Sequence, residues 1–320
     1  MNTKLSTLAV AVAAALTLPA LALADTATVT QSGSFNDGVV LQNSNANATA
    51  TINVTGNNND DFIDQYGNGT VTATIKVNNG NSNKAVVEQF RSGDNSTVTI
   101  TQSRDRNDAF ANQVRAYRST IDVTQTRSDN KAVVEQGDSW RDTAKVMQTG
   151  NHGDAFIEQY DTALSKASIT DSGNYDKSVI DQWNVSWADA AITQGGGYRN
   201  DATINQYDGV SLKASINQNG SLNMAVAEQT GYHNDSNIIQ RGLGNDAFTS
   251  QSGKSHDSSI NQNGVYNTAV ALQSGYNHNS IIMQNGLGNN AHVVQAGWSN
   301  SHLSTVTQNG MANNAYVQQH

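Results

Sequence analysis

Cysteine is absent from this 320-residue chain, and proline occurs only at Pro19. Without cysteine the chain can form no disulfide, thiolate metal site or cysteine nucleophile. Proline removes a backbone donor and is therefore excluded from the interior of a hydrogen-bonded sheet. The lack of proline after residue 19 is consistent with a backbone that enters β-ladders along most of its length.

Charge and aromatic side chains are also scarce. Charged residues make up 14% of the sequence, aromatic residues 6% and hydrophobic residues 37%. A strongly charged disordered chain would carry more charge, and a conventional thick core would need more apolar residues. The net charge of -9, with no Lys/Arg cluster, argues against nucleic acid as a partner. The many Gly, Asn, Gln, Ser and Thr residues favour a tightly ordered β-structure.

Long apolar runs are missing except at the start of the chain. Lys4 precedes an apolar run from Leu5 to Leu18, and Ala22-Leu23-Ala24 offers a cleavage site before Asp25. This pattern predicts a Sec signal peptide over residues 1–24. The run is short for a retained span of about 30 Å of hydrocarbon. We therefore expect residues 25–320 to be exported.

From residue 25 onward the chain consists of a repeat of 22 to 24 residues, a period typical of solenoids. One half of the repeat has the form Asn-x-Ala-x-Val-x-Gln, and its glutamine is present in all thirteen copies. These anchors are Gln42, Gln65, Gln89, Gln113, Gln136, Gln159, Gln182, Gln206, Gln229, Gln251, Gln273, Gln295 and Gln319. The motif asparagines include Asn83, Asn107, Asn223, Asn267 and Asn289.

The other half of the repeat has its own anchor position. Glutamine fills it in ten copies, and Val54, Val77 and Asp171 fill it in the other three. Two residues earlier the residue is always Val or Ile, for example Ile238, Ile260 and Ile282. A spacing of two puts both residues on one face of a strand. Each repeat is therefore predicted to be strand, turn, strand, turn, with strands of about six residues.

Glycine clusters two residues after the anchors, as at Gly264 and Gly286, where we expect it to permit a tight reversal. Stacking one repeat per rung, at about 4.8 Å, gives two parallel in-register sheets packed face to face. A buried unpaired amide costs about 1–3 kcal/mol, and a stack of identical amides avoids this by hydrogen bonding between rungs. The predicted fold is an all-β, cross-β solenoid of about thirteen repeats over 25–320. The alternative, a disordered Asn/Gln-rich tract, lacks such strict alternation.

Residues 96–113 and 282–295 carry most of the pattern Ser-x5-Gln-x-Gly-x4-Asn-x-Ala-x3-Gln, which resembles the curlin repeat of bacterial curli subunits. This resemblance covers 25–320 and implies a structural subunit of an extracellular functional amyloid. Such a subunit crosses the inner membrane and then an outer-membrane pore of a Gram-negative cell, and polymerises into surface fibres for biofilm and adhesion. The resemblance implies self-association and, as partners, a nucleator subunit, the secretion pore and accessory chaperones, with polysaccharide or host matrix proteins as further candidates. It implies no cofactor.

Three features depart from the familiar curli subunit. This chain has about thirteen repeats rather than about five. Only residues 25–30 precede Gln31, where curli subunits carry a Gly/Asn-rich targeting segment. The last repeat of the nucleator is basic, whereas this chain ends Tyr316-Val-Gln-Gln-His320. The last difference favours the major, fibre-forming subunit over the minor nucleator.

The sequence offers no catalytic constellation, so we expect no enzyme. Asp60-Asp61 and the scattered aspartates are interpreted as solvated turn residues, because no apolar pocket is evident that would shift their pKa values. The glycine-rich turns lack the lysine and helix of a phosphate-binding loop.

Three histidines share one position in the repeat. His256, His278 and His302 each lie six residues before an anchor glutamine, so they are predicted to form a ladder on adjacent rungs. Stacked imidazoles would bind a transition metal or make assembly sensitive to pH. A polar turn position that happens to hold histidine is the simpler alternative, and we favour it.

Two outward-facing sets of side chains suggest binding surfaces. Aromatic residues follow several anchors and either stack against polysaccharide or cover the turn; they are Tyr66, Phe90, Tyr160, Trp183 and Tyr207. The threonine sets 97-99-101 and 28-30 support an alternative function, a monomeric secreted β-solenoid that binds ice or carbohydrate. Unpaired parallel edges at both ends favour polymerisation, since such edges template the next chain.

Overall fold

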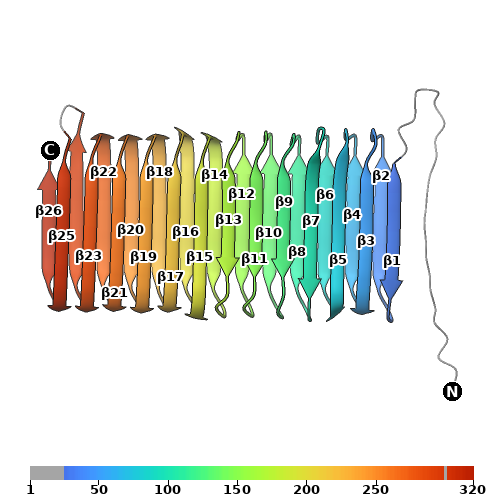
Figure 1. Cartoon of the computed structure of the whole chain (residues 1–320), viewed down its shortest axis with the longest axis horizontal. Coiled ribbons are helices and arrows are strands. Elements are labelled where there is room, and N and C mark those ends of the chain that lie inside the picture. Colours follow the sequence, from blue (N-terminus) through green and yellow to red (C-terminus); the bar gives the residue numbers. More distant parts are fainter. Residues whose placement is uncertain (1–24, 299–300) are drawn as a thin grey trace, which may run out of the picture.

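The computed structural model describes residues 25–298 and 301–320 and shows an all-β solenoid (Figure 1). The described strands form two 13-stranded sheets. Adjacent strands in each sheet are every second strand of the chain, so that β3 lies between β1 and β5. Each rung contributes one strand to each sheet, and paired strands are parallel. The predicted fold is confirmed. The predicted signal peptide, residues 1–24, lies outside the described residues.

Sheet A contains the odd-numbered strands. They are β1 (Thr26–Ser32), β3 (Thr49–Asn57), β5 (Val71–Asn81), β7 (Ser96–Ser103), β9 (Thr120–Gln125), β11 (Thr143–Gln148), β13 (Lys166–Asp171), β15 (Asp189–Tyr198), β17 (Lys213–Ser221), β19 (Asp235–Leu243), β21 (Asp257–Val265), β23 (Asn279–Leu287) and β25 (Leu303–Met311).

Sheet B contains the even-numbered strands. They are β2 (Asp37–Asn43), β4 (Asp60–Tyr66), β6 (Lys84–Phe90), β8 (Asp108–Val114), β10 (Lys131–Gly137), β12 (Asp154–Tyr160), β14 (Lys177–Ser186), β16 (Asp201–Val210), β18 (Met224–Tyr232), β20 (Asp246–Lys254), β22 (Thr268–Tyr276), β24 (Asn290–Gly297) and β26 (Asn314–Gln319).

The core lies between the two sheets and follows from the alternation in the sequence. Along β12 the side chains alternate between buried and half-buried, so that Ala155, Ile157 and Gln159 point inward. Ile238 pairs with Ile260, and Ile260 with Ile282, so equivalent residues stack directly on one another. Because alanine and β-branched residues fill most of the interior, the two sheets pack at short range.

Many strands are longer than the six residues expected from the sequence, and β5 reaches 11. The reason is that pairing continues past the anchor through a column of stacked glycines, as in Gly242–Gly264–Gly286. At Gly264 φ is +148°, and a Cβ would lie 1.9 Å from the carbonyl oxygen of Gly286. The prediction that these glycines form the reversal is therefore wrong: they lie within the ladder. The left-handed turn residue comes two positions later, as at Tyr266 with φ 54°.

The two ends of the solenoid are open among the described residues. The rung β1–β2 and the rung β25–β26 each have a neighbouring rung on one side only, and they lie at opposite ends of the molecule (Figure 1). Their inward residues Val29, Val40, Ala315 and Val317 are consequently only partly buried. No helix within the described part of the chain is long and apolar enough to cross a membrane.

Candidate functional site

The thirteen anchor glutamines of sheet B form one continuous ladder. Each Nε2 donates to Oε1 of the glutamine on the following rung, from Gln42 to Gln319, at 2.7–3.0 Å. The second amide hydrogen of most of them reaches a backbone carbonyl of the opposite half-repeat, as from Gln229 to Lys213 O at 2.7 Å. The interior members are buried. Where both amide hydrogens have partners, these hydrogen bonds offset the cost of burying the amide.

Sheet A carries a second glutamine ladder that is interrupted. It runs from Gln102 to Gln148 and again from Gln194 to Gln308, with the donor always on the earlier rung. Asp171 separates the two runs. Before the first run, Val54 and Val77 occupy the column, and Gln31 Nε2 has no partner among the described residues.

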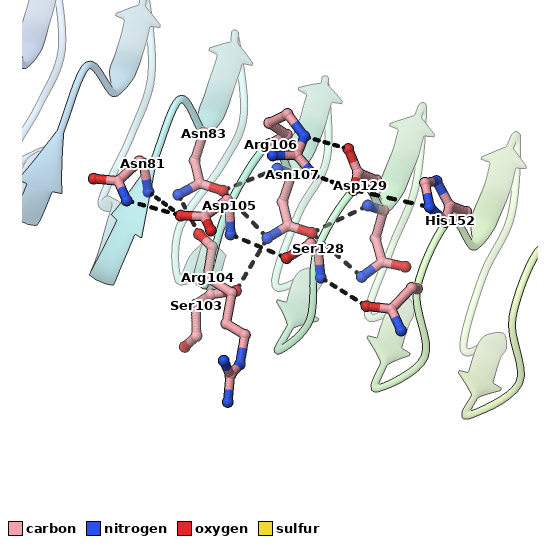
Figure 2. Close-up of polar contacts among 12 residues, drawn as sticks. Asn81, Asn83, Ser103, Arg104, Asp105, Arg106, Asn107, Ser128, Asp129 and His152 are labelled. Atoms are coloured by element: carbon pink, nitrogen blue, oxygen red, sulfur yellow. Dashed lines mark hydrogen bonds and ion pairs between the residues drawn. The ribbon is translucent and has the colours of Figure 1, made fainter.

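The motif asparagines form a third ladder, at one corner of the solenoid (Figure 2). Asn83 Oδ1 accepts both the backbone N–H and the Nδ2–H of Asn107, at 2.9 and 3.2 Å. Asn107 Nδ2 also donates to the carbonyl of Ser103 at 3.0 Å, which holds the turn. The same contacts link Asn223 to Asn200, Asn267 to Asn245 and Asn289 to Asn267.

The ladders have opposite polarity. Each glutamine donates to the glutamine of the following rung, as Gln295 does to Gln319. Each asparagine instead donates to the asparagine of the preceding rung, as Asn313 does to Asn289. The last rung therefore presents an amide donor at Gln319 and an acceptor at Asn313. The first rung presents the acceptor Oε1 of Gln42 and the backbone donor of Asn36. The two ends are complementary to each other and not to themselves.

Several aspartates lie inside the solenoid, so interpreting them as solvated turn residues was wrong. Asp61 is 1% exposed, its carboxylate has no hydrogen bond among the described residues, and burial raises its pKa to about 8. It occupies the inward position that Ala85 fills on the next rung. Alignment of the repeats on that alanine would have found it. Asp142, held by Thr162 Oγ1 and the backbone N–H of Ser165 at 2.7 Å each, has its pKa raised to about 6 by burial.

Asp171 and Asp176 form a buried carboxyl pair. Burial, together with the negative charge of Asp176, raises the pKa of Asp171 to about 8. Gly153 makes room for this pair, because a Cβ there would lie 2.4 Å from Asp171 Oδ2. Within residues 25–298 and 301–320, no group of three or more His, Cys, Asp or Glu side chains is arranged to hold a metal ion.

The three histidines stack on adjacent rungs. Ring centroids are 5.1 Å apart for His256–His278 and 4.6 Å apart for His278–His302, with interplanar angles of 19° and 23°. Burial lowers the pKa of His256 to about 4 and also lowers the pKa of His278. The rings of His256 and His278 are therefore neutral at neutral pH.

The outer surface of sheet B carries the predicted aromatic side chains. Tyr66 stacks on Phe90 with centroids 5.3 Å apart, and Tyr160 stacks on Trp183 at 4.6 Å. Tyr207 instead donates to Asp181 at 2.6 Å. The structure thus forms two separate stacked pairs rather than one continuous aromatic face.

Charged residues pair along the corners in the central rungs. Arg106 donates to both carboxylate oxygens of Asp129, at 2.6 and 2.7 Å, and His152 lies beyond it (Figure 2). Arg115 and Asp138 form a second bidentate pair. These exposed pairs link successive turns, and each contributes little to stability.

Comparison with known families agrees with this geometry. Residues 79–103, which cover the end of β5 together with β6 and β7, match the family model of the curlin associated repeat. The chain therefore contains a curlin repeat. The matched curlin repeat contains Asn83, Gln89 and Gln102, one member of each amide ladder, and the ladders extend the same contacts to rungs on both sides. No curated protein matches the chain.

Proposed function

We propose that this curlin-repeat protein is the fibre-forming subunit of an extracellular functional amyloid of the curli type, serving biofilm matrix and cell adhesion. The repeat and the solenoid fold support a structural rather than a catalytic role. The observation that carries the proposal is the pair of open, complementary end rungs. Gln319 directs an amide donor out of one end, and Gln42 directs an amide acceptor out of the other.

Complementary but unlike ends favour an open polymer. When two copies bind through different patches, one patch stays free at each end of the pair. Further copies can then add at both ends, and the result is a filament unless the rotation between copies closes a ring. Incoming strands then pair across copies as they pair within one, so folding and polymerisation are one process. A slip of one residue would turn every inward glutamine and isoleucine outward, which fixes the register.

The route and partners of this subunit follow from its resemblance to curli subunits. Residues 1–24 direct Sec export and are then removed, and the chain crosses the outer membrane through a dedicated pore with accessory chaperones. A separate nucleator subunit starts the fibre at the surface of a Gram-negative cell. The uncharged segment 258–320 suits the fibre-forming role, since charged residues act against aggregation.

Seeded polymerisation tests this function. Purified residues 25–320 should show a thioflavin lag phase, fragmented fibres should abolish it, and electron microscopy should show unbranched fibres. A chain that stays monomeric at high concentration in the presence of seeds would overturn the proposal.

A second function, binding of ice or a regular carbohydrate surface, is favoured by one observation. The outer face of sheet A carries a column of six consecutive threonines: Thr26, Thr49, Thr72, Thr97, Thr120 and Thr143. A parallel column holds Thr28, Thr51, Thr74 and Thr99. Hydroxyls would repeat at about 4.8 Å across rungs and about 6.6 Å along strands. Thermal hysteresis by a soluble monomer, lost on Thr51→Lys and Thr74→Lys substitution, would support it; no hysteresis would rule out ice.

A further inference from the structure

One corner of the solenoid gathers arginines that lie far apart in the sequence. The turns that follow β6, β8 and β10 place Arg91, Arg115, Arg118 and Arg141 where the chain passes from sheet B to sheet A. The sequence shows no cluster of basic residues here, because a full repeat separates Arg118 from Arg141. Stacking of the repeats is what brings these side chains to one corner.

Arg118 and Arg141 occupy equivalent positions on adjacent rungs. The backbone N–H of Arg118 donates to Asp94 O at 3.2 Å, and that of Arg141 donates to Tyr117 O at 2.8 Å. Both arginines are exposed, and both have the left-handed φ of this turn position, 54° and 59°. Two guanidinium groups on rungs about 4.8 Å apart repel each other. An anion shared between them would offset this repulsion and accept hydrogen bonds from both.

The carboxylates on the surrounding turns do not neutralise these two arginines. Asp138 pairs with Arg115. Asp94 Oδ1 instead accepts the backbone N–H of Thr70 at 3.4 Å. Asp161, on the following turn, forms no ion pair within the described residues. Neither of the two arginines has a side-chain hydrogen bond or ion pair in that part of the chain, although the whole protein carries a net charge of -9.

Two exposed aromatic rings lie beside these arginines. Tyr117 and Trp140 pair across adjacent rungs and are 50% and 43% exposed. The guanidinium carbon of Arg141 lies 4.4 Å from the centre of the Trp140 ring, and this cation–π contact holds the cation at the corner. We call the surface of Tyr117, Arg118, Trp140 and Arg141 the arginine corner. It presents cations and apolar ring surface together along the solenoid axis.

We propose that the arginine corner binds an acidic polysaccharide. Uronate carboxylates pair with Arg118 and Arg141, because a planar guanidinium can give a carboxylate two parallel hydrogen bonds. The apolar faces of the sugar rings pack on Trp140 and Tyr117, whose rings supply large apolar contact area. Because the two arginines are stacked along the solenoid, the polymer runs along that axis. The site is complete within one copy of the chain, so it does not rest on polymerisation.

Nucleic acid fits the arginine corner less well. Proteins bind nucleic acid largely through many phosphate contacts, whereas this corner supplies two unpaired cations on a chain of net charge -9. Two cations beside apolar rings suit a polymer that carries its charges between apolar sugar faces.

The opposite corner offers a matched comparison on neighbouring turns. Arg104 and Arg127 each follow a sheet A anchor glutamine by two residues, and both are exposed and form no ion pair within the described residues. Their turns, residues 103–107 and 126–130, contain Asp105 and Asp129 but no aromatic residue. Substitution of these two arginines therefore removes the same charge without touching a cation that lies beside a ring.

Fluorescence anisotropy of a labelled oligogalacturonate, with freshly purified residues 25–320, tests the site. Arg118→Gln with Arg141→Gln should weaken binding about tenfold or more, since two charge-assisted contacts are lost. Trp140→Ala should weaken it about fivefold, the loss of one aromatic contact. Arg104→Gln with Arg127→Gln should change it by less than about twofold. The methyl-esterified oligomer keeps the sugar rings but loses the charge, and should bind about tenfold more weakly or worse.

Each contrary result overturns the proposal and leaves the fibre-forming function standing, because that function is tested separately by seeded polymerisation. Equal weakening by the two double variants would assign binding to overall charge, provided that both keep the β-sheet circular dichroism of the unsubstituted protein. Equal binding of the methyl ester would remove the role of the carboxylates. No binding of oligogalacturonate by the unsubstituted protein would exclude the ligand class. Tighter binding of a single-stranded DNA oligonucleotide, lost in the Arg118 and Arg141 double variant, would assign the corner to nucleic acid instead.

Discussion

His256 and His278 are joined by a hydrogen bond from the backbone N–H of the second to Nδ1 of the first, at 3.3 Å. His256 Nε2 is 3.1 Å from the carbonyl oxygen of Ser252, so the ring proton belongs on Nε2. Protonation of Nδ1 would place a donor against a donor and add like charges one rung apart. The histidine stack is therefore built for neutral rings, and its metal-binding alternative has no ligand cluster among the described residues to support it.

Acid should loosen the C-terminal rungs. Burial lowers the pKa of His256 from 6.5 to about 4 and lowers that of His278. Because the folded-state pKa is lower than the unfolded-state pKa, the stability that these histidines contribute is complete at a pH above the unfolded-state pKa. It is lost as the pH falls through the folded-state pKa. Hydrogen exchange of fibres at pH 7, 5.5 and 4 should show protection in β21, β23 and β25 falling toward pH 4.

A triple variant controls for other acid effects. Asparagine supports the same contacts at the opposite corner and does not titrate, so His256→Asn, His278→Asn and His302→Asn together should remove most of this pH dependence. An unchanged loss of protection in that variant would show that the histidines are not its cause.

Asp61→Ala should stabilise the assembly at neutral pH. The pKa of Asp61 is raised to about 8 by burial and then by the charge of Asp60. Because the folded-state pKa of Asp61 is higher than its unfolded-state pKa, the contribution of Asp61 to stability is complete at a pH below the unfolded-state pKa. That contribution is lost as the pH rises through about 8. At pH 7 we expect a gain of about 1–3 kcal/mol, the cost of an unsatisfied buried polar group, in denaturant titrations of fibres.

The adjacent residue provides the comparison for Asp61. Asp60 is exposed, so Asp60→Ala should change stability by only about 0.5 kcal/mol. The gain from Asp61→Ala should also shrink toward pH 3. Equal gains at pH 3 and pH 7 would contradict the raised pKa of Asp61.

Interrupting the sheet B ladder should be costly. Gln113 accepts from Gln89 at 2.8 Å and donates to Gln136 at 2.9 Å and to Ser119 O at 3.1 Å. Gln113→Ala leaves two buried glutamines, Gln89 and Gln136, without their partner, which should cost about 2–6 kcal/mol at about 1–3 kcal/mol for each. Asn112→Ala, on the opposite face of β8, should cost about 0.5 kcal/mol. Similar denaturation midpoints for both variants would contradict a stabilising role for the ladder.

The glycine column should not accept alanine. Gly264→Ala would place a Cβ 1.9 Å from Gly286 O at a φ of +148°. Seeded growth should slow at least tenfold. Gly196→Ala should leave the rate unchanged, because a Cβ there would have no heavy atom within 4 Å. Normal growth of the Gly264 variant would mean that the fibre does not use this backbone.

The sequence predicts the fold and the positions of the ladders, but not the direction of their hydrogen bonds. Strict two-residue alternation and the 22 to 24 residue spacing are enough to place Gln89 and Gln113 one above the other. They do not reveal which amide atom donates, because donor direction depends on side-chain torsions and on the carbonyl that binds the second hydrogen. The burial of Asp61 follows from its inward position in the repeat, whereas its residue type alone favours solvent. The sequence does not predict the longer strands, because Gly264 continues the ladder at a φ of +148°, which favours glycine.

The central claim, that copies stack end to end along the solenoid axis, is tested most directly by high-resolution electron microscopy of fibres grown from residues 25–320. Thirteen rungs at about 4.8 Å predict one subunit per about 62 Å along the axis, with no break in the rung spacing at the junction. A monomeric sample, or fibres whose solenoid axes lie across the fibre, would contradict the account.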